Sequence, residues 1–200
     1  ALYDMPAVKA QLKLTYTVLD GGELKVKMQM TTDKNAKVSD MLRFGMVMQM
    51  PYNMDQIRYF GRGPIENYSD RKASERIGIY KQTADNQFFP YIRPHENGTK
   101  QDVKWWQQTN ASGTGLEIHG ELGDLSMSAL HYAIADLDDG LEKGQRHSYQ
   151  VKKSPFTNLC IDKEQTGVGG TNSWGEWPLE RYRLHYGDRT YEFLLRPIVK

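Results

Sequence analysis

The stretch QLKLTYTVLDGGELKVKMQM, residues 11–30, alternates apolar and polar residues on both sides of a turn signal. Successive side chains of a strand point to opposite faces of a sheet, so a period of two predicts two half-buried strands. The Asp-Gly-Gly sequence at 20–22 predicts a tight turn between them. The segment is therefore predicted to form an antiparallel β-hairpin. The positions assigned to its buried face are Leu12, Leu14, Tyr16, Val18, Leu24, Val26, Met28 and Met30.

The same period recurs along the chain, and a helical period is nearly absent. Strands are predicted within 41–50, 115–121, 125–132, 147–151, 179–187 and 189–197. In 41–50 the stripe of Leu42, Phe44, Met46, Met48 and Met50 indicates a core face rather than an adaptable methionine-rich binding surface. Only 134–144 resembles a short helix, and Gly140 limits its length. Many strands separated by turns predict an all-β sandwich, with residues 1–200 as a single domain.

Composition excludes several classes of protein. The chain has 200 residues, 38% of them hydrophobic and 26% charged, which is typical of a globular domain. A formal charge of +1 argues against a general nucleic-acid or anionic-membrane surface. No apolar run reaches the roughly 20 residues of a membrane-spanning helix. The single cysteine, Cys160, lies in an alternating apolar run and is predicted to be a buried, inert thiol. The bacterial cytoplasm and periplasm both remain open as compartments.

The five histidines show no spacing that would build a metal site. None pairs with another at i,i+4 or with a cysteine, so no metal ligand is predicted. His131 lies within a predicted strand and is interpreted as a hydrogen-bonded structural residue. His95, beside Glu96 in a proline-flanked loop, is the one histidine retained as a candidate ligand or acid.

Two glutamates lie in irregular polar loops. Glu66 and Glu96 could be nominated as the pair of carboxyl groups that a glycosidase needs. The favoured alternative is that Glu66 joins nearby charged residues in a hydrogen-bonded network that holds its loop. The other members of that predicted network are Arg62, Asp70 and Arg71.

Aromatic residues provide the strongest chemical signal. The segment GVGGTNSWGEWP, residues 167–178, carries Trp174 and Trp177 in a run of turn-forming residues. An indole can cover the C–H face of a sugar ring, with a gain of about 1–2 kcal/mol. Trp105, Trp106 and the 12 tyrosines also suit a carbohydrate ligand. The alternative is that a tryptophan pins its own loop, which is preferred for Trp177 and left open for Trp174.

Several separated motifs then carry a family resemblance. They are YFGRGPIENYSDRK (59–72), PYIRPHENGTKQDVKWW (90–106), LSMSALHY (125–132) and NLCIDKEQTGVGGTNSWGEW (158–177), followed by YEFLLRP (191–197). In this order the chain resembles the C-terminal small-chain domain of the multidomain β-galactosidases of glycoside hydrolase family 2. The resemblance implies an antiparallel supersandwich, similar to galactose mutarotases. It also implies a fragment truncated at its N-terminal side, with an open sheet edge where a homo-oligomer can form.

The resemblance also implies where the chemistry lies. Both catalytic glutamates would come from a TIM barrel elsewhere in the parent enzyme, so no catalytic residue is expected here. Trp174, with Ser173 and Asn172, would contact the sugar, and His95 and Glu96 are weaker candidates for substrate binding. The family often has two aspartates where this chain has Thr171 and Asn172, which alters the polarity of the loop. No cofactor is expected in this segment, because Mg and Na would be bound by other domains.

The function expected from these implications is that of an accessory domain. It would complete the active-site mouth of a β-galactosidase and be inactive as an isolated chain. Its expected partners are the other domains of that enzyme, chiefly the TIM barrel, and the galactoside substrate. Two alternatives are an autonomous mutarotase-like sugar epimerase and a stand-alone carbohydrate-binding module.

Overall fold

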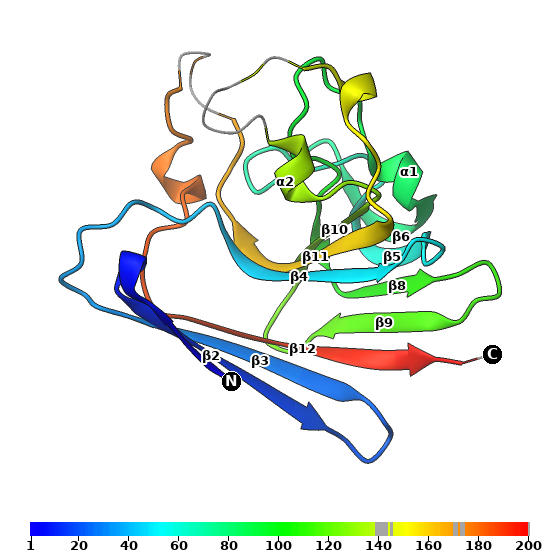
Figure 1. The fold of residues 1–200 in the computed structure, drawn as a ribbon, viewed down its shortest axis with the longest axis horizontal. Coiled ribbons are helices and arrows are strands. Elements are labelled where there is room, and N and C mark those ends of the chain that lie inside the picture. Colours follow the sequence, from blue (N-terminus) through cyan, green and yellow to red (C-terminus); the bar gives the residue numbers. More distant parts are fainter. Residues whose placement is uncertain (139–143, 145, 170–171, 173–174, 200) are drawn as a thin grey trace.

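The computed structural model describes residues 1–138, 144, 146–169, 172 and 175–199, and they form two antiparallel sheets packed face to face (Figure 1). The larger sheet has the strand order β1 (Leu2–Met5), β2 (Ala10–Val18), β3 (Leu24–Thr32), β12 (Arg189–Ile198), β9 (Gly115–Gly120), β8 (Trp105–Thr109), β5 (Gln56–Gly63) and β6 (Arg76–Thr83). The smaller sheet has the order β4 (Arg43–Pro51), β11 (Phe156–Gln165), β10 (Leu125–Leu130) and β7 (Lys100–Val103). The helical segments are short: α1 (Ala84–Gln87), α2 (Ile134–Leu137) and the 3-10 turns η1 (Pro6–Val8), η2 (Ser148–Gln150) and η3 (Glu180–Tyr182). The predicted all-β sandwich is confirmed.

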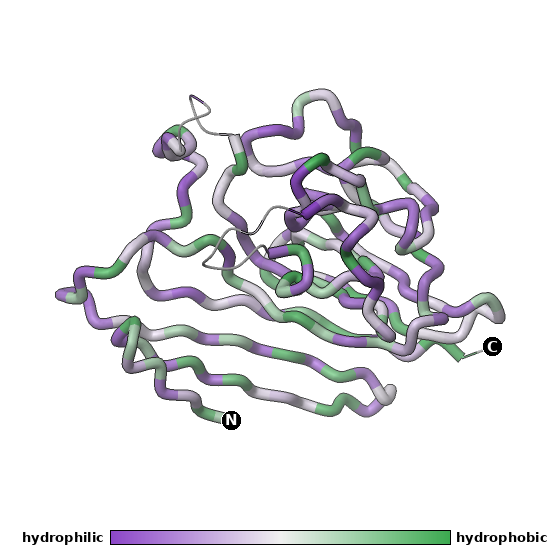
Figure 2. The backbone as a smooth tube through the Cα atoms, turned by 45° about the horizontal axis from the view of Figure 1, so that its top comes forward, coloured by the Kyte–Doolittle hydropathy of each residue, from purple (hydrophilic) through white to green (hydrophobic). Residues whose placement is uncertain are grey.

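The hairpin predicted at 11–30 is present as β2 and β3. The two strands pair from Ala10 opposite Thr32 to Val18 opposite Leu24. Gly22 has a φ of 78°, a left-handed conformation that glycine adopts without a steric cost. Hydrophobic and hydrophilic residues alternate along the hairpin, as Figure 2 shows. The turn chemistry and the alternation thus specify the same register. The assignment of Tyr16 and Val18 to the buried face is wrong, because these two residues near the turn are 53% and 76% exposed.

The main core fills the space between the two sheets. Met28, Trp106 and Phe193 come from the larger sheet, and Met127 and Leu159 from the smaller one; all five side chains are buried. The alternation along β4 places Met46, Met48 and Met50 against this core. The interpretation of the methionine stripe as a core face is therefore confirmed. Leu42 is the exception, because it precedes β4 and is 73% exposed.

Two predicted strands are wrong. Residues 147–151 contain η2, and residues 179–187 contain η3 followed by a single bridge between Leu184 and Met41. In the second segment, polar contacts hold the alternating residues: Arg183 and His185 both hydrogen-bond to Asp40. Alternation there reflects polar contacts to a neighbouring loop rather than a strand ladder. The helix expected at 134–144 is present as α2, and 139–143 lie outside the described residues.

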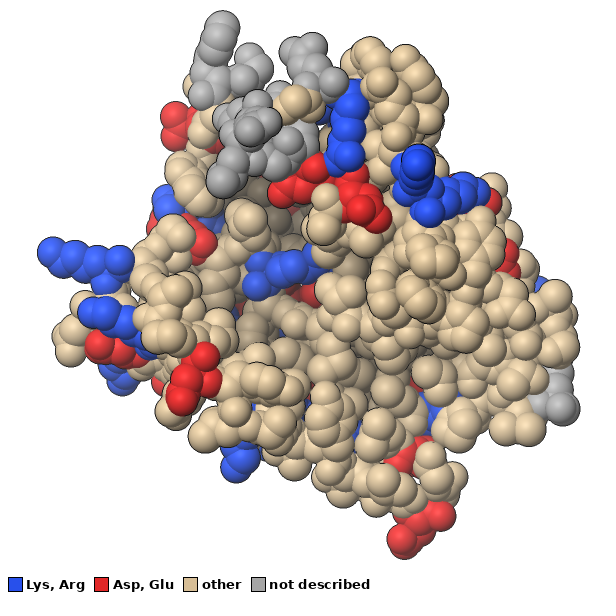
Figure 3. Space-filling model, viewed as in Figure 1, with Lys and Arg blue, Asp and Glu red and all other residues tan. Residues whose placement is uncertain are grey.

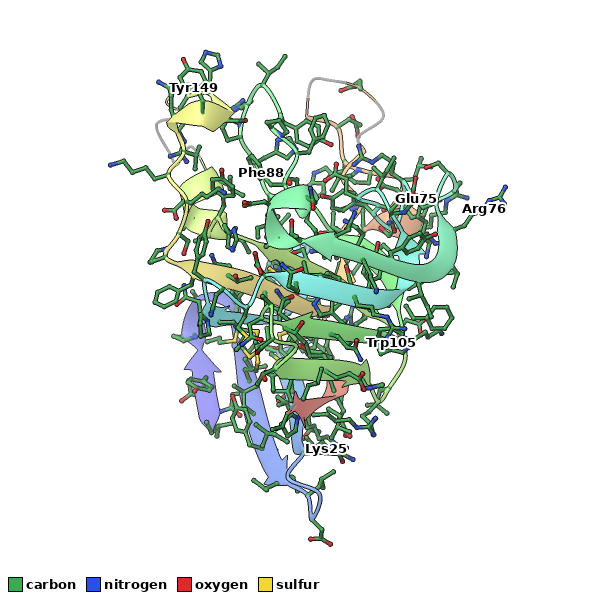
Figure 4. The ribbon with its side chains drawn as sticks, turned by 90° about the vertical axis from the view of Figure 1, so that its right-hand side faces the viewer. Lys25, Glu75, Arg76, Phe88, Trp105 and Tyr149 are labelled. Atoms are coloured by element: carbon green, nitrogen blue, oxygen red, sulfur yellow. The ribbon has the colours of Figure 1, made fainter. Side chains whose placement is uncertain are left out.

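The smaller sheet is covered on both faces over β10. One face meets the core, and α1, α2 and the long connections lie over the other face, at the top of Figure 1. The prediction that 125–132 is half-buried is therefore wrong, because every residue of β10 is buried. Figure 4 shows Phe88 and Tyr149 on this loop-bearing side, whereas Lys25 and Trp105 belong to the larger sheet.

Candidate functional site at the loop-bearing face

The three predicted sugar-contacting residues belong to the 167–178 segment. Two of them, Ser173 and Trp174, lie outside the described residues, and the third, Asn172, is exposed. The structure therefore leaves the role of Trp174 as a prediction, and what it defines is the base of this loop.

Asp70 holds that base through the backbone. Its carboxylate accepts hydrogen bonds from the backbone N–H of Val168 at 3.1 Å and of Gly169 at 2.7 Å. The N–H of Gly167 donates to the carbonyl of Tyr182 at 2.7 Å. A Cβ at Gly167 would lie 2.5 Å from the Asp70 carboxylate, so only glycine allows this approach. The glycine-rich sequence thus serves to bring the loop backbone onto an acidic side chain.

The other tryptophans have different environments. Trp177 is 43% exposed, and the Arg183 guanidinium lies 5.0 Å from its ring centre. Trp106 is fully buried, and its Nε1 donates to Gln108 Oε1 at 2.9 Å. The suggestion that Trp106 suits a sugar is therefore wrong, because it belongs to the core. Trp105 lies under Arg58, with 4.9 Å between the guanidinium and the ring centre.

Glu66 holds its own loop, as the favoured interpretation predicted. It accepts hydrogen bonds from the Gly98 N–H at 2.8 Å, from Arg71 at 2.6 Å and from the Tyr91 hydroxyl. Burial acts to raise the pKa of Glu66, but these hydrogen bonds outweigh it and lower the pKa below its usual value.

The remaining members of the predicted network bind elsewhere. Arg62 pairs with Asp102 at 2.7 Å, and Asp70 holds the base of the 167–178 loop. The single network expected from the sequence is thus three separate contacts.

Glu96 belongs to a partly buried ionic centre with Arg43 and Asp162. Arg43 Nη1 donates to Glu96 Oε1 at 2.6 Å, and the same guanidinium reaches both carboxylate oxygens of Asp162. Burial raises the pKa of Asp162 to about 6, although the Arg43 guanidinium acts in the opposite direction. The neighbouring carboxylates outweigh burial at Arg43 and raise its pKa, so it stays charged.

The ionic centre lines a cavity beside the loop base. Arg43, Glu96, Tyr68 and Thr166 contribute to a cavity of about 180 Å³ that also touches Gly167 and Val168. Figure 3 shows basic and acidic side chains together in a hollow on the face seen in Figure 1. No sequence motif identified Arg43 and Asp162 as a pair, because they are 119 positions apart. The available sequence signal was that each of them is a charged residue within an alternating run.

His95 does not join this centre. Its ring stacks on Tyr91, with 4.4 Å between the centroids, and its Nδ1 lies 2.9 Å from the Arg93 carbonyl oxygen. His131 is 1% exposed and hydrogen-bonds Asp85 and the Tyr52 carbonyl, so its predicted structural role is confirmed. Cys160 is buried, and burial raises the pKa of its thiol to about 11, which confirms the prediction of an inert thiol.

In the described ranges, no group of three or more His, Cys, Asp or Glu residues is arranged to hold a metal ion. None of the described helices is long and apolar enough to cross a bilayer.

Taken together, the fold and the site define an all-β sandwich whose long loops gather over one sheet and present an anchored, aromatic-bearing loop. The model of the β-galactosidase small-chain family matches residues 2–195. The chain belongs to this family.

Curated relatives agree with this assignment. A β-galactosidase of Priestia megaterium is 32% identical over 94% of this chain, and one of Lactobacillus delbrueckii subsp. bulgaricus is 32% identical over 85%. A β-galactosidase of Vibrio cholerae is 26% identical over 98% of the chain. The matches cover only 18%, 16% and 18% of these relatives, respectively, so this chain spans less than a fifth of their length.

Proposed function

We propose that this chain is the accessory small-chain domain of a β-galactosidase and completes the mouth of an active site formed by other domains, chiefly a TIM barrel. The observation that carries the proposal is the match of the small-chain family model to nearly the whole of this chain, combined with coverage of under a fifth of each relative. The parent reaction would be retaining hydrolysis of terminal β-galactosides by two carboxyl groups.

The two glutamates nominated as a catalytic pair, Glu66 and Glu96, support a role without proton transfer. Glu66 accepts from Arg71, and Glu96 accepts from Arg43, so each carboxylate is already held by a guanidinium. A general acid at neutral pH needs a raised pKa, whereas the pKa of Glu66 is lowered. We assign both catalytic carboxylates, and any Mg or Na, to the other domains.

The contribution of this chain would be substrate placement by the 167–178 loop. Trp174 would stack on the C–H face of the galactosyl ring, with Ser173 and Asn172 offering hydroxyl and amide groups beside it. The Asp70 contacts to Val168 and Gly169 support this role, because a fixed base limits the positions open to the tip. The binding role of His95 and Glu96 is weaker, since both side chains already have partners within the chain.

Hydrolysis of a chromogenic β-galactoside tests the proposal. The isolated chain should show no turnover above buffer. In the enzyme that contains this chain, Trp174→Ala should lower kcat/KM by about 5–30-fold, which corresponds to a stacking contact of about 1–2 kcal/mol. Trp177→Ala is the matched control and should have a smaller effect. Turnover by the isolated chain, or full activity of Trp174→Ala, would contradict the proposal.

A further inference from the structure

The outer face of the smaller sheet has a polar floor. The strand register places Leu130, Asn158 and Gln49 in one row across the sheet, and Ser128, Cys160 and Val47 in the next. Residues directly opposite each other in antiparallel strands share a face. Ser128, Asn158 and Cys160 are at most 5% exposed, so polar groups lie beneath the loops that cover this face.

A cavity of about 230 Å³ lies over this floor. Its opposite wall is apolar and comes from Tyr132, Ile134 and Leu137, in and beside α2. Leu137 packs with Leu130 and Val151 in a small hydrophobic cluster, which Phe88 and Tyr132 extend. The cavity reaches the surface at β4, where Val47 is 53% exposed.

The polar groups of the lining suit a ligand with several hydroxyl groups. Gln49 and Asn158 carry carboxamides, which both donate and accept hydrogen bonds, and Ser128 adds a hydroxyl. Gln49 Nε2 donates to Asn158 Oδ1 at 3.0 Å, which fixes the orientation of the pair. Asn158 Nδ2 reaches the carbonyls of Leu130 and Phe156 only at 3.5 and 3.4 Å, so a ligand oxygen offers it a better acceptor.

The charge of the lining favours a neutral ligand. Among the described residues of this lining Glu96 is the charged one, and Arg43 pairs with it at 2.6 Å. Because this charge is already matched, an ionic ligand would gain little there and would lose its hydration. The Cys160 thiol remains protonated at neutral pH, since its pKa is raised to about 11.

We propose that this cavity, lined by Gln49, Ser128, Asn158 and the α2 wall, binds a single neutral pyranose ring. The hydroxyl edge of the ring would face the sheet, and its C–H face would lie against Tyr132 and Ile134. The volume suits a single ring, because it is below the roughly 300–1,000 Å³ of pockets that hold drug-sized ligands. The described lining of the cavity comes from β4, β10, β11, α2 and neighbouring connections and contains no described residue of the 167–178 loop.

Galactose titrated into the isolated chain tests the proposal by calorimetry or by ligand-observed NMR. We expect saturable binding with a Kd on the order of 1–10 mM, because so small a ligand makes few contacts. Tetrahydropyran-2-methanol, which has the ring but few hydroxyls, should bind at least about tenfold more weakly. Equal binding of both probes, or no saturation by galactose, would overturn the proposal.

Two variants locate the binding. Val47→Trp should fill the mouth of the cavity and abolish galactose binding, whereas Val18→Trp, at an exposed strand position of the other sheet, should not. Gln49→Met keeps the length of the side chain but removes its amide, and should weaken binding about fivefold or more. Unchanged near-UV circular dichroism verifies the fold of each variant. Binding that survives Val47→Trp in a folded protein would overturn the site.

Failure of this site and failure of the proposed function are distinguishable. The Trp174→Ala change should leave galactose binding at this cavity unchanged, because no described residue of the 167–178 loop lines the cavity. Conversely, Val47→Trp should leave hydrolysis by the parent enzyme unchanged. An effect of Trp174→Ala on this binding would mean that the loop, rather than the cavity, holds the sugar.

Discussion

Lys100 is a buried lysine with little compensation for its charge. It is 1% exposed, and its Nζ donates to the Gly98 carbonyl at 2.8 Å. Burial lowers the pKa of Lys100 from 10.5 to about 8, although Glu66 and Glu75 act in the opposite direction. Below pH 8 the lysine is protonated in both the folded and unfolded states, so the folded state bears the full cost of burying a charge.

We therefore expect Lys100→Met to stabilise the protein near pH 7, by about 3 kcal/mol at most. Between pH 8 and 10.5 the unfolded chain binds the proton more strongly, so the unfolding free energy of the native protein rises with pH. Urea unfolding at pH 7, 8 and 9.5 should show the gap between native protein and variant closing. A gap that is constant with pH would show that Lys100 is not the group responsible.

Asp70 anchors the base of the 167–178 loop, and a single substitution can test this role. Asp70→Ala removes the acceptor for the Val168 and Gly169 N–H groups, and hydrogen bonds to a charged group contribute about 1.5–3 kcal/mol each. Amide hydrogen exchange at these two positions should accelerate by about 10–100-fold. Asp20→Ala, at an exposed aspartate in the hairpin turn, is the control and should leave both rates unchanged. Unaltered exchange rates in Asp70→Ala would contradict the role of Asp70 as the loop anchor.

At the scale of the element, β4 depends on a glycine. Gly45 lies opposite Asp162 in β11, and a Cβ at this position would be 1.8 Å from Asp162 Oδ1. The missing side chain lets the Asp162 carboxylate fold over β4 and reach Arg43. The pairing of β4 with β11 and the Arg43–Asp162 contact therefore both require a glycine at position 45.

Gly45→Ala should displace Asp162 and destabilise the fold by about 1–3 kcal/mol, the usual cost of overpacking. Gly21→Ala is the matched control, because nothing lies within 4 Å of a Cβ there and the substitution should change stability little. Thermal unfolding of both variants measures the difference. An equal effect of the two substitutions would contradict the steric argument.

Elements with a single buried face were predictable from the sequence. The β2–β3 hairpin and β12 combine a period of two with clear turn signals, and each lies close to its predicted bounds. For β10 the period of two predicts one buried face, but both faces are buried, because loops distant in sequence cover the outer one. At 179–187 the same period predicts a strand that is absent, because the alternating Arg183 and His185 contact Asp40 instead of a strand ladder.

The candidate site was predictable only in its local parts. Sequence motifs identify the 167–178 loop and the Glu66–Arg71 pair, whose partners are five positions apart. Asp70 lies 98 positions from Val168, and the Gln49–Asn158 pair spans 109. Such contacts follow from the packing and register of strands, which no local pattern encodes.

At the scale of the whole molecule, the two sheets are joined by a buried polar contact as well as by the core. Tyr191 of β12 is 1% exposed, and its hydroxyl donates to the Ile161 carbonyl of β11 at 2.8 Å. Phe44 of β4 meets the Tyr191 ring edge-on, with 5.7 Å between the centroids. One side chain of the larger sheet thus contacts two strands of the smaller sheet.

Tyr191→Phe should cost about 1 kcal/mol, the net contribution of one buried hydrogen bond. Because both sheets share one core, the loss should lower the stability of the whole domain rather than of one sheet. Tryptophan fluorescence, to which Trp105 and Trp106 of the larger sheet contribute, and far-UV circular dichroism should therefore shift to the same lower midpoint in urea. Tyr16→Phe, at a 53% exposed position of β2, should leave the midpoint unchanged. Two separate midpoints in Tyr191→Phe would show that the sheets unfold independently, and the domain would then not be one cooperative unit.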